Sequence, residues 1–298
     1  MRAHFNTPPQ STIYGFERDV EGVYVRRRFT FSQDFLIEHD LPTVAMWLEN
    51  PDMSDPSHRN EILSAIYLIL ASPLGPHVIS EGVRQSKIDT GRSASTWLHL
   101  RNVVRHLPRA SRFALTFGYE RFLRPGRKVP GFVVPSAANV YPLYYHGEHL
   151  PSRESYIAPT SETDALGMPR MRTKLHFAEK DIRNAIRAHE HLDRYLRRSG
   201  LGRLEYLFED PADGLRKELI DGYHQAGTTR MSDRPEDGVL NSDLAVHGFE
   251  DLFVASSSAF VTSGQANSTF MIVVFALRLA DHLRHGLRPY AQAPASVA

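Results

Sequence analysis

The residue types best suited to chemistry gather in residues 223–283, where polar segments lie on both sides of a short apolar run. This region opens near His224, passes an apolar run at 251–255, and reaches Asn267 just before a helical pattern over 268–285. A strand that passes through a tight loop into a helix offers an anionic ligand free backbone N–H groups and the positive helix end. We therefore expect a ligand-binding site here, with the side chains of His224 and Asn267 at the same opening.

Other motifs in the chain carry weaker signals. Three pairs of histidines have a spacing that suits metal chelation, but no recognised set of carboxylates and histidines surrounds them, so we predict no metal site. The serine run at 256–258 lacks the Gly-x-Ser-x-Gly pattern of a nucleophile elbow. Gly200 and Gly202 follow a helical pattern, which favours a helix C-cap over a dinucleotide loop. The histidine pairs are His146 with His149, His189 with His191, and His282 with His285.

The composition is that of an ordinary globular protein. The 298 residues are 42% hydrophobic, and 35 basic residues face 34 acidic ones, so net charge selects no partner. The absence of cysteine excludes disulfides, thiolate metal sites and a cysteine nucleophile. The N-terminus lacks the apolar core of a signal peptide, and the most apolar run, 62–71, is too short to span a bilayer. These features predict a soluble, cytoplasmic protein.

The pattern of elements predicts an α+β protein. Alternating residues favour strands in 13–31 and again in 132–177, where the last strand alternates apolar and basic residues as a half-buried strand does. Between them, prolines interrupt a helical insertion over about 32–125. The helix expected at 179–199 has one apolar stripe and ends at Gly200. Strands followed by a covering helix favour an antiparallel sheet with helices on one side.

A local charge bias lies inside the helical insertion. Residues 84–128 contain eleven Lys and Arg against two acidic residues, with large apolar side chains interleaved. Such a segment can form a basic amphipathic surface for anionic lipid, nucleic acid or a partner protein. The interpretation we favour is a solvated helix face over a core, and no nucleic-acid module accompanies the charge. We therefore expect no nucleic-acid partner and give peripheral membrane contact little weight.

Four ordered blocks in the C-terminal region resemble the signature of a known family. They begin with His-x-x-Gly-Thr-x-Arg-Met at 224–231, continue through 246–255 and the Thr-Ser-Gly-Gln-Ala-Asn-Ser-Thr run at 262–269, and end at 276–283. This pattern resembles the C-terminal part of the glucose-methanol-choline (GMC) family of flavoprotein oxidoreductases. Upstream the resemblance is weaker, and we match nothing between about residues 32 and 140.

The resemblance implies oxidation of a small-molecule alcohol or sugar hydroxyl with FAD as the electron acceptor. By its place in the motif, His224 would be the catalytic base or the partner of the substrate oxygen, a task that suits an imidazole. Asn267 stands where the family has its second His or Asn, and its amide would hold the same oxygen. The N–H groups of Ser268 and Thr269 would face the flavin and stabilise its reduced form. The cofactor-binding residues implied in this way are Gly227, Thr228, Ser256, Ser257, Gly264, Ser268 and Thr269.

The chain departs from the family pattern in one large respect and in smaller ones. The family binds the FAD pyrophosphate with a strand, a Gly-x-Gly-x-x-Gly loop and a helix, and these 298 residues contain no such segment. Ser256 stands where the family often has Asp, and Val261 and Ser268 stand where it often has Pro.

We therefore expect three parts in this chain. They are a substrate-binding domain at 1–222, the last strand and helix of an incomplete FAD-binding α/β domain at 223–286, and a flexible tail at 287–298. The catalytic half would need a companion chain that carries the FAD-binding segment, and would be inactive without it. The alternative is a truncated, catalytically silent remnant that acts as an interaction or structural protein.

Overall fold

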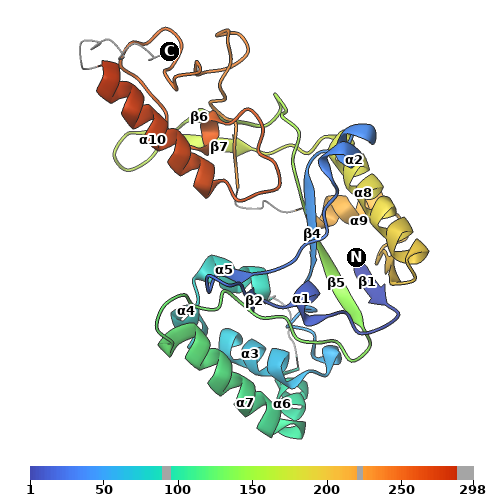
Figure 1. Ribbon diagram of the computed structural model, residues 1–298. Coiled ribbons are helices and arrows are strands. Elements are labelled where there is room, and N and C mark those ends of the chain that lie inside the picture. Colours follow the sequence, from blue (N-terminus) through green and yellow to red (C-terminus); the bar gives the residue numbers. More distant parts are fainter. Residues whose placement is uncertain (89–94, 220–223, 287–298) are drawn as a thin grey trace, which may run out of the picture. The chain divides into compact units, whose positions relative to one another are not determined.

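The computed structural model describes residues 1–88, 95–219 and 224–286. The chain forms two compact units, and each draws on several stretches of sequence (Figure 1). Unit 1 contains residues 1–29, 46–144 and 190–207, and unit 2 contains residues 30–45, 145–189 and 208–298. The tail expected at 287–298 and the boundary expected between 222 and 223 lie outside the described residues, so the domain boundaries stay a prediction.

Most of a four-stranded sheet lies in unit 1, while residues 44–45 of β4 and 145–147 of β5 fall in unit 2. Its strands follow the order β4–β5–β1–β8. Strand β1 is antiparallel to both of its neighbours, and Ala3 lies opposite Tyr141 on one side and Leu204 on the other. All three side chains are buried, and this fixes the register because a shift by one residue would turn them to the other face. The strands are β1 (Arg2–Phe5), β4 (Val44–Leu48), β5 (Val140–Gly147) and β8 (Gly202–Glu205).

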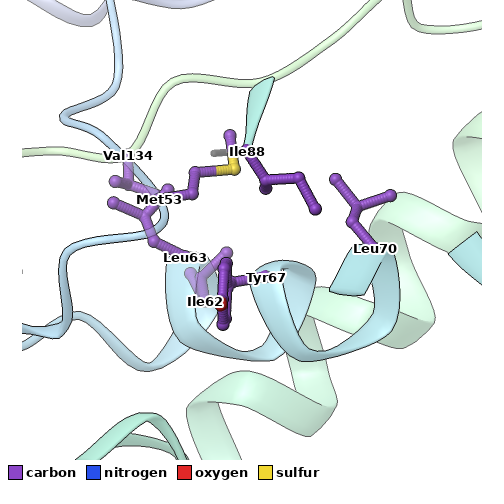
Figure 2. Packing of buried hydrophobic residues seen from close by; sticks show 7 residues of the cluster. All are labelled: Met53, Ile62, Leu63, Tyr67, Leu70, Ile88 and Val134. Carbon is purple, nitrogen blue, oxygen red and sulfur yellow. The ribbon is translucent and has the colours of Figure 1, made fainter. Parts of the chain in front are cut away.

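Three helices of unit 1 pack around an apolar core. Helix α3 (Glu61–Ala71) begins at Asn60, whose side-chain oxygen accepts hydrogen bonds from the first backbone N–H groups of the helix. Helices α6 (Thr96–Arg105) and α7 (Leu107–Gly118) both contact α3 (Figure 1). Burial of one face of each helix stabilises all three, against this core for α3 and α7 and against α3 for α6. Figure 2 shows the core residues, which are Met53, Ile62, Leu63, Tyr67, Leu70, Ile88 and Val134.

The strand expected over 13–31 is wrong in its extent. The structure has only the short hairpin of β2 (Glu17–Arg18) and β3 (Tyr24–Val25), followed by a single bridge between Phe29 and Met46. Alternation of residue types marks an extended chain, but a strand also needs a neighbour along its length, and this segment pairs only over two residues at a time.

Two further segments of unit 1 differ from the expected pattern. Strand β4 lies inside the stretch expected to be helical, because a run of five apolar residues suits a buried strand as well as a helix. Residues 132–134 form no strand, and the Asn50 side chain instead bonds the carbonyl of Phe132 and the N–H of Val134. The remaining short elements of this unit are α1 (Ser11–Tyr14), η1 (Pro56–His58), α4 (Gly75–Val78), α5 (Glu81–Lys87) and η2 (Tyr119–Leu123).

Unit 2 contains a hairpin of β6 (Tyr156–Thr163) and β7 (Pro169–Lys174). Its turn follows the prediction, because Gly167 has a φ of +78° and the Asp164 carboxylate accepts two backbone N–H bonds. Strand β7 is exposed on both faces, so the half-buried strand that we expected here is wrong. A two-stranded hairpin has no second layer to cover it, whatever its residue alternation. The other elements of the unit are α2 (Gln33–Glu38), α9 (Pro211–Glu218), η3 (Ser257–Ala259) and α10 (Thr269–Gly286).

The apolar run at 251–255 forms a single bridge, from Phe253 to Ala245, where we expected a buried strand. Its residues nonetheless lie beside a small core, because Phe253 and Val254 pack against buried side chains of unit 2. The α+β class is confirmed in its mixture of helices and antiparallel strands. The buried members of this core are Leu240, Leu244, Ala259 and Leu279.

Helix α8 (Glu179–Arg198) agrees with the sequence in both its bounds and its end. Its apolar stripe is buried at Ile182, Leu192 and Leu196. Gly200 follows the helix with a φ of +68°, the left-handed conformation of a helix C-cap. Among the described residues, no helix is long and apolar enough to cross a membrane.

His189 on α8 gives the fold a pH dependence. The side chain is 2% exposed, and burial lowers the pKa of His189 to about 3. In the unfolded chain this histidine takes up a proton near pH 6.5. Below that pH the folded protein binds fewer protons than the unfolded chain, so the free energy of unfolding falls as pH falls. We expect the free energy of unfolding to be about 2 kcal/mol lower at pH 5 than above pH 6.5. Denaturant unfolding at a series of pH values measures this difference. His189→Gln should flatten this slope, whereas His285→Gln at an exposed position should leave it unchanged.

Candidate active site

Two segments that are far apart in the sequence are joined by backbone hydrogen bonds in unit 2. The N–H of Gly227 donates to the carbonyl of Ser257 at 3.2 Å, and that of Met231 donates to the carbonyl of Ala259 at 3.0 Å. Gly227 has a φ of +82°, and a Cβ at this position would lie 3.2 Å from the carbonyl oxygen of Phe260. A residue with a side chain would be strained there, so the close approach of the two segments depends on glycine.

Side chains strengthen the same junction. Thr229 donates its N–H to the carbonyl of Ser258 at 2.9 Å and its hydroxyl to the Ser258 Oγ at 2.7 Å. The Ser256 Oγ accepts the N–H of Ser258 at 2.9 Å, which starts the turn η3. The structure therefore brings Gly227 together with the serine run, whereas Thr228 is exposed between these bonds.

His224 comes directly before this junction. Its ring lies 5.5 Å from the ring of His146, centroid to centroid, with the planes tilted by 38°. The Nδ1 atom of His224 is buried and has no hydrogen-bond partner within the part of the chain that the structure describes. A buried polar atom without a hydrogen bond destabilises the fold by about 1–3 kcal/mol. A ligand that bonded this atom would remove that cost.

The loop of Gly264 and Gln265 lies near the end of β5, the strand that carries His146. Thr43 accepts the N–H of Glu148 at 3.0 Å and donates its hydroxyl to the Glu148 carboxylate at 3.2 Å. A Cβ on Gly264 would lie 3.6 Å from the Thr43 hydroxyl oxygen, and Gly264 has a φ of +64°. The Oε1 atom of Gln265 is buried without a hydrogen-bond partner in the described chain. Two buried polar atoms without partners thus lie in segments that border the same strand end.

The start of α10 follows the prediction. The carbonyl of Ser268 accepts the N–H of Ile272 at 3.0 Å, which makes Ser268 the N-cap residue and leaves the first N–H groups of the helix available. Asn267 is exposed immediately before this cap. No hydrogen bond joins Asn267 to His224 within the described residues, so their meeting at one substrate oxygen stays a prediction.

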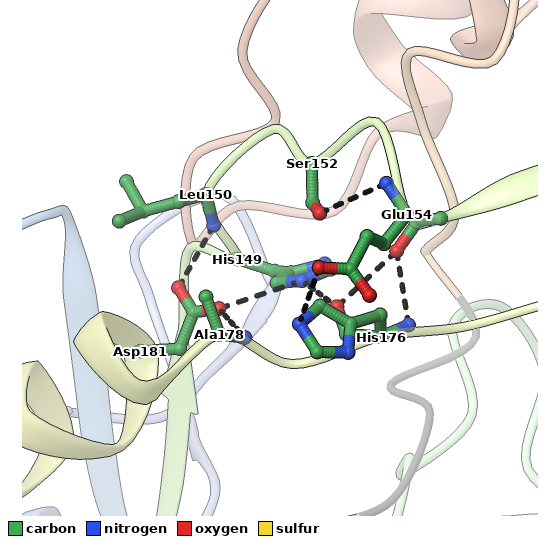
Figure 3. Close-up of polar contacts among 8 residues, drawn as sticks. His149, Leu150, Ser152, Glu154, His176, Ala178 and Asp181 are labelled. Carbon is green, nitrogen blue, oxygen red and sulfur yellow. Dashed lines mark hydrogen bonds and ion pairs between the residues drawn. The ribbon is translucent and has the colours of Figure 1, made fainter.

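The remaining histidines near β5 serve the fold. His149 bonds the backbone carbonyl of His176 at 2.8 Å and lies 3.5 Å from the carboxylate of Asp181 (Figure 3). The same carboxylate accepts the N–H groups of Leu150 and Ala178, and so fixes the start of α8. Of the described residues, no group of three metal-ligating side chains could hold a metal ion. His149 is therefore a structural residue.

Sequence reasoning missed two residues of this site. His146 was grouped with His149 by spacing, but its ring faces His224 and comes from a strand that is distant in the sequence. Gln265 lies inside one of the conspicuous blocks, yet only its buried, unpartnered oxygen distinguishes it. The alternation of strand residues could have placed His146 and Glu148 on one face, but no local signal pairs either with the His224 segment.

Comparisons with known proteins found matches to part of the chain. Residues 151–276 match the family model described as GMC oxidoreductase. The chain is 24% identical over 164 residues to the fructose dehydrogenase large subunit of Gluconobacter japonicus, a match that covers 55% of this chain and 28% of that protein. It is 29% identical over 143 residues to 2-methyl-1,2-propanediol dehydrogenase of Mycolicibacterium austroafricanum, which covers 47% of this chain and 24% of that protein.

The matches extend over only part of these relatives, because the chain spans about a quarter of their length. Among solved structures, the pyridoxine 4-oxidase of Mesorbium loti is 19% identical, with a TM-score of 0.38 over 52% of this chain and 31% of that one. The family model covers three of the four ordered blocks that the sequence singled out and reaches the first residue of the fourth. Residues 151–276 of this chain are thus similar to the C-terminal domain of the GMC oxidoreductases.

Proposed function

We propose that this chain is the catalytic and substrate-binding half of an FAD-dependent oxidoreductase that oxidises the CH–OH group of an alcohol or sugar. The observation that carries the proposal is His224, whose Nδ1 is buried without a partner in the described chain. A neutral imidazole in such a position is suited to take a hydroxyl proton. The GMC oxidoreductase match of residues 151–276 supports the reaction class.

Each residue of the proposed site has one task. His224 accepts the proton of the substrate hydroxyl while the hydrogen on the adjacent carbon leaves as a hydride. FAD, when bound, supplies the N5 atom that takes this hydride. The amide of Asn267 holds the substrate oxygen in line, and the N–H groups of Ser268 and Thr269 at the start of α10 favour an anionic flavin edge.

One feature of the residues present fits a bound flavin. Gln265 has a buried side-chain oxygen without a partner in the described chain, which is suited to accept a hydrogen bond from a ligand. Gly227 and Gly264 have positive φ values that favour glycine, and they shape the two segments that border the His146 strand end.

The exposed apolar surface of helix α10 is an argument for a companion segment. Its apolar residues point in nearly every direction, yet Leu279 is the only buried one among its described side chains. Phe270 is 75% exposed and Leu277 is 66% exposed. A helix that is apolar all round is normally covered. We propose that the segment that binds the FAD pyrophosphate, supplied from outside these 298 residues, covers this face.

The proposed substrates are sugars and 1,2-diols. The two relatives act on fructose and on 2-methyl-1,2-propanediol by their names, and both are CH–OH donors. Fructose and 2-methyl-1,2-propanediol are therefore the first compounds to test with this chain, FAD and a polypeptide that carries the Gly-rich segment. Loss of flavin absorbance under anaerobic conditions is the expected result. If flavin binds but no sugar or alcohol reduces it, the proposed reaction class is wrong.

Asn267 gives a second test of the same assembly. Asn267→Ala is expected to slow flavin reduction about a hundredfold, because the substrate oxygen is no longer held in line. Asn267→His should retain most of the rate, since an imidazole can donate to the same oxygen. Stopped-flow absorbance of the flavin measures both variants. Equal rates for wild type, Asn267→Ala and Asn267→His would contradict the role given to this residue.

A further inference from the structure

Helices α6 and α7 of unit 1 each expose large apolar side chains. On α6, Trp97, Leu100 and Val104 lie three or four residues apart and so share one helix face, and Trp97 is 70% exposed. On α7, Leu115 is 76% exposed, and the turn η2 after it exposes Phe122. The basic residues of these helices are solvated over a core, as we favoured from sequence, but large apolar side chains are exposed among them.

The opposite faces of the same helices form the core contacts. On α6, His99 and Asn102 are buried and bond Ser64 of α3. On α7, the rings of Phe113 and Phe117 both pack edge-on against Phe132, at 5.0 and 5.2 Å. Each helix thus has a core face already in use, and the exposed apolar residues form a second, separate face.

Positive charge surrounds this second face. In residues 95–128 the only acidic residue is Glu120, and its carboxylate is already bound by Arg124 and by the Tyr24 hydroxyl. The face therefore combines apolar anchors with a one-sided field that attracts anions. The exposed basic residues are Arg101, Arg105, Arg112, Arg121, Arg127 and Lys128, whereas the exposed Arg109 is paired with Glu61 of α3.

We propose that this basic apolar face, formed by α6, α7 and η2, binds the surface of an anionic lipid bilayer. Basic side chains contact lipid headgroups, and the exposed aromatic and aliphatic side chains enter the boundary between headgroups and acyl chains. Nucleic acid would match the charge but would leave Val104 and Leu115 in water, because phosphates and stacked bases offer aliphatic side chains little. The face draws on residues of unit 1 and the proposed active site on residues of unit 2, so the two proposals rest on different observations.

Vesicle binding by the full chain tests the proposal. The chain is expected to sediment with vesicles of phosphatidylglycerol and phosphatidylcholine in equal parts, and to stay in solution with phosphatidylcholine alone. Raising salt to about 1 M should weaken binding, because charges are then screened beyond about 3 Å. No binding to the anionic vesicles, or equal binding to both kinds, overturns the proposal. Retention by double-stranded DNA without vesicle binding also overturns it and assigns the face to nucleic acid.

Tryptophan emission reports whether the apolar anchors enter the bilayer. The chain has two tryptophans, so Trp47→Phe leaves Trp97 as the sole tryptophan. Its emission is expected to move to shorter wavelength with anionic vesicles, because the ring leaves water. An unchanged spectrum under conditions where the protein sediments with vesicles contradicts insertion at this face.

Charge and anchor variants locate the contact. The combined change Arg101→Glu, Arg105→Glu and Arg112→Glu should weaken binding at least a hundredfold, and Leu115→Ser with Phe122→Ser at least tenfold. Arg170→Glu with Arg172→Glu reverses two charges on the exposed strand β7, is the control at another site, and should bind as wild type does. Circular dichroism verifies that the exposed changes leave the fold intact. Equal weakening by the control would assign binding to overall charge and overturn the proposal.

Discussion

Replacing His224 with alanine is expected to slow reduction of the bound flavin by substrate about a thousandfold, while the flavin spectrum before substrate addition stays unchanged. The reason is that His224 has a buried Nδ1 without a partner in the described chain and lies beside a strand end that borders the Gly264 loop. Removal of its imidazole leaves the substrate hydroxyl with no base to take its proton. Anaerobic stopped-flow absorbance with the reconstituted assembly measures the rate.

The control for this change is a histidine outside the site. His106 is exposed between α6 and α7 in unit 1, so His106→Ala should retain the wild-type rate. His146→Ala removes the ring that faces His224 and is expected to give a smaller loss than His224→Ala, because it only positions the base. A wild-type rate in His224→Ala would refute the assigned role, provided that the variant still binds flavin.

Gly202→Ala is expected to destabilise unit 1 by about 3 kcal/mol, the largest effect on stability that we predict for a single methyl group. Gly202 pairs with Phe5 across β8 and β1, and a Cβ there would lie 1.9 Å from the carbonyl oxygen of His4. Two non-bonded heavy atoms cannot approach so closely. Strands β1 and β8 must therefore move apart and lose part of their pairing. Thermal unfolding followed by circular dichroism should show a midpoint lower by several degrees.

A second glycine provides the matched control. Gly82 lies in helix α5, and a Cβ at that position meets nothing within 4 Å. Gly82→Ala should therefore stabilise the protein slightly, by up to about 1 kcal/mol, through the better helix propensity of alanine. If Gly202→Ala unfolds at the same midpoint as Gly82→Ala, the close approach of β8 to β1 is not as the structure shows.

Gly200 and Gly202 show which features neighbouring residues can predict and which depend on distant parts of the chain. The left-handed φ of Gly200 follows from its place after a helix, and the sequence predicted it. Gly202 is required for a different reason, because β1 comes from the other end of the chain and its backbone presses on this position. No spacing near Gly202 contains that information, and the interpretation of both glycines as one helix cap missed it.

For the strands and the site as well, local sequence predicts some features and distant contacts decide the others. The run 251–255 was apolar enough for a buried strand, but a strand depends on its neighbours, and here a single bridge forms. The blocks around His224 and Asn267 predicted the family because the motif is written in consecutive residues. The approach of His146 to His224 joins β5 to a distant loop, and only the folded structure reveals it.

The absorption spectrum of the chain after incubation with FAD tests the central claim most directly. The chain is mixed with FAD and a polypeptide that carries the Gly-rich strand, loop and helix, and unbound FAD is removed by gel filtration. We predict that the flavin bands elute with the protein at close to one FAD per chain. A colourless protein, both alone and with that polypeptide, would contradict the claim that this chain forms half of a flavin site.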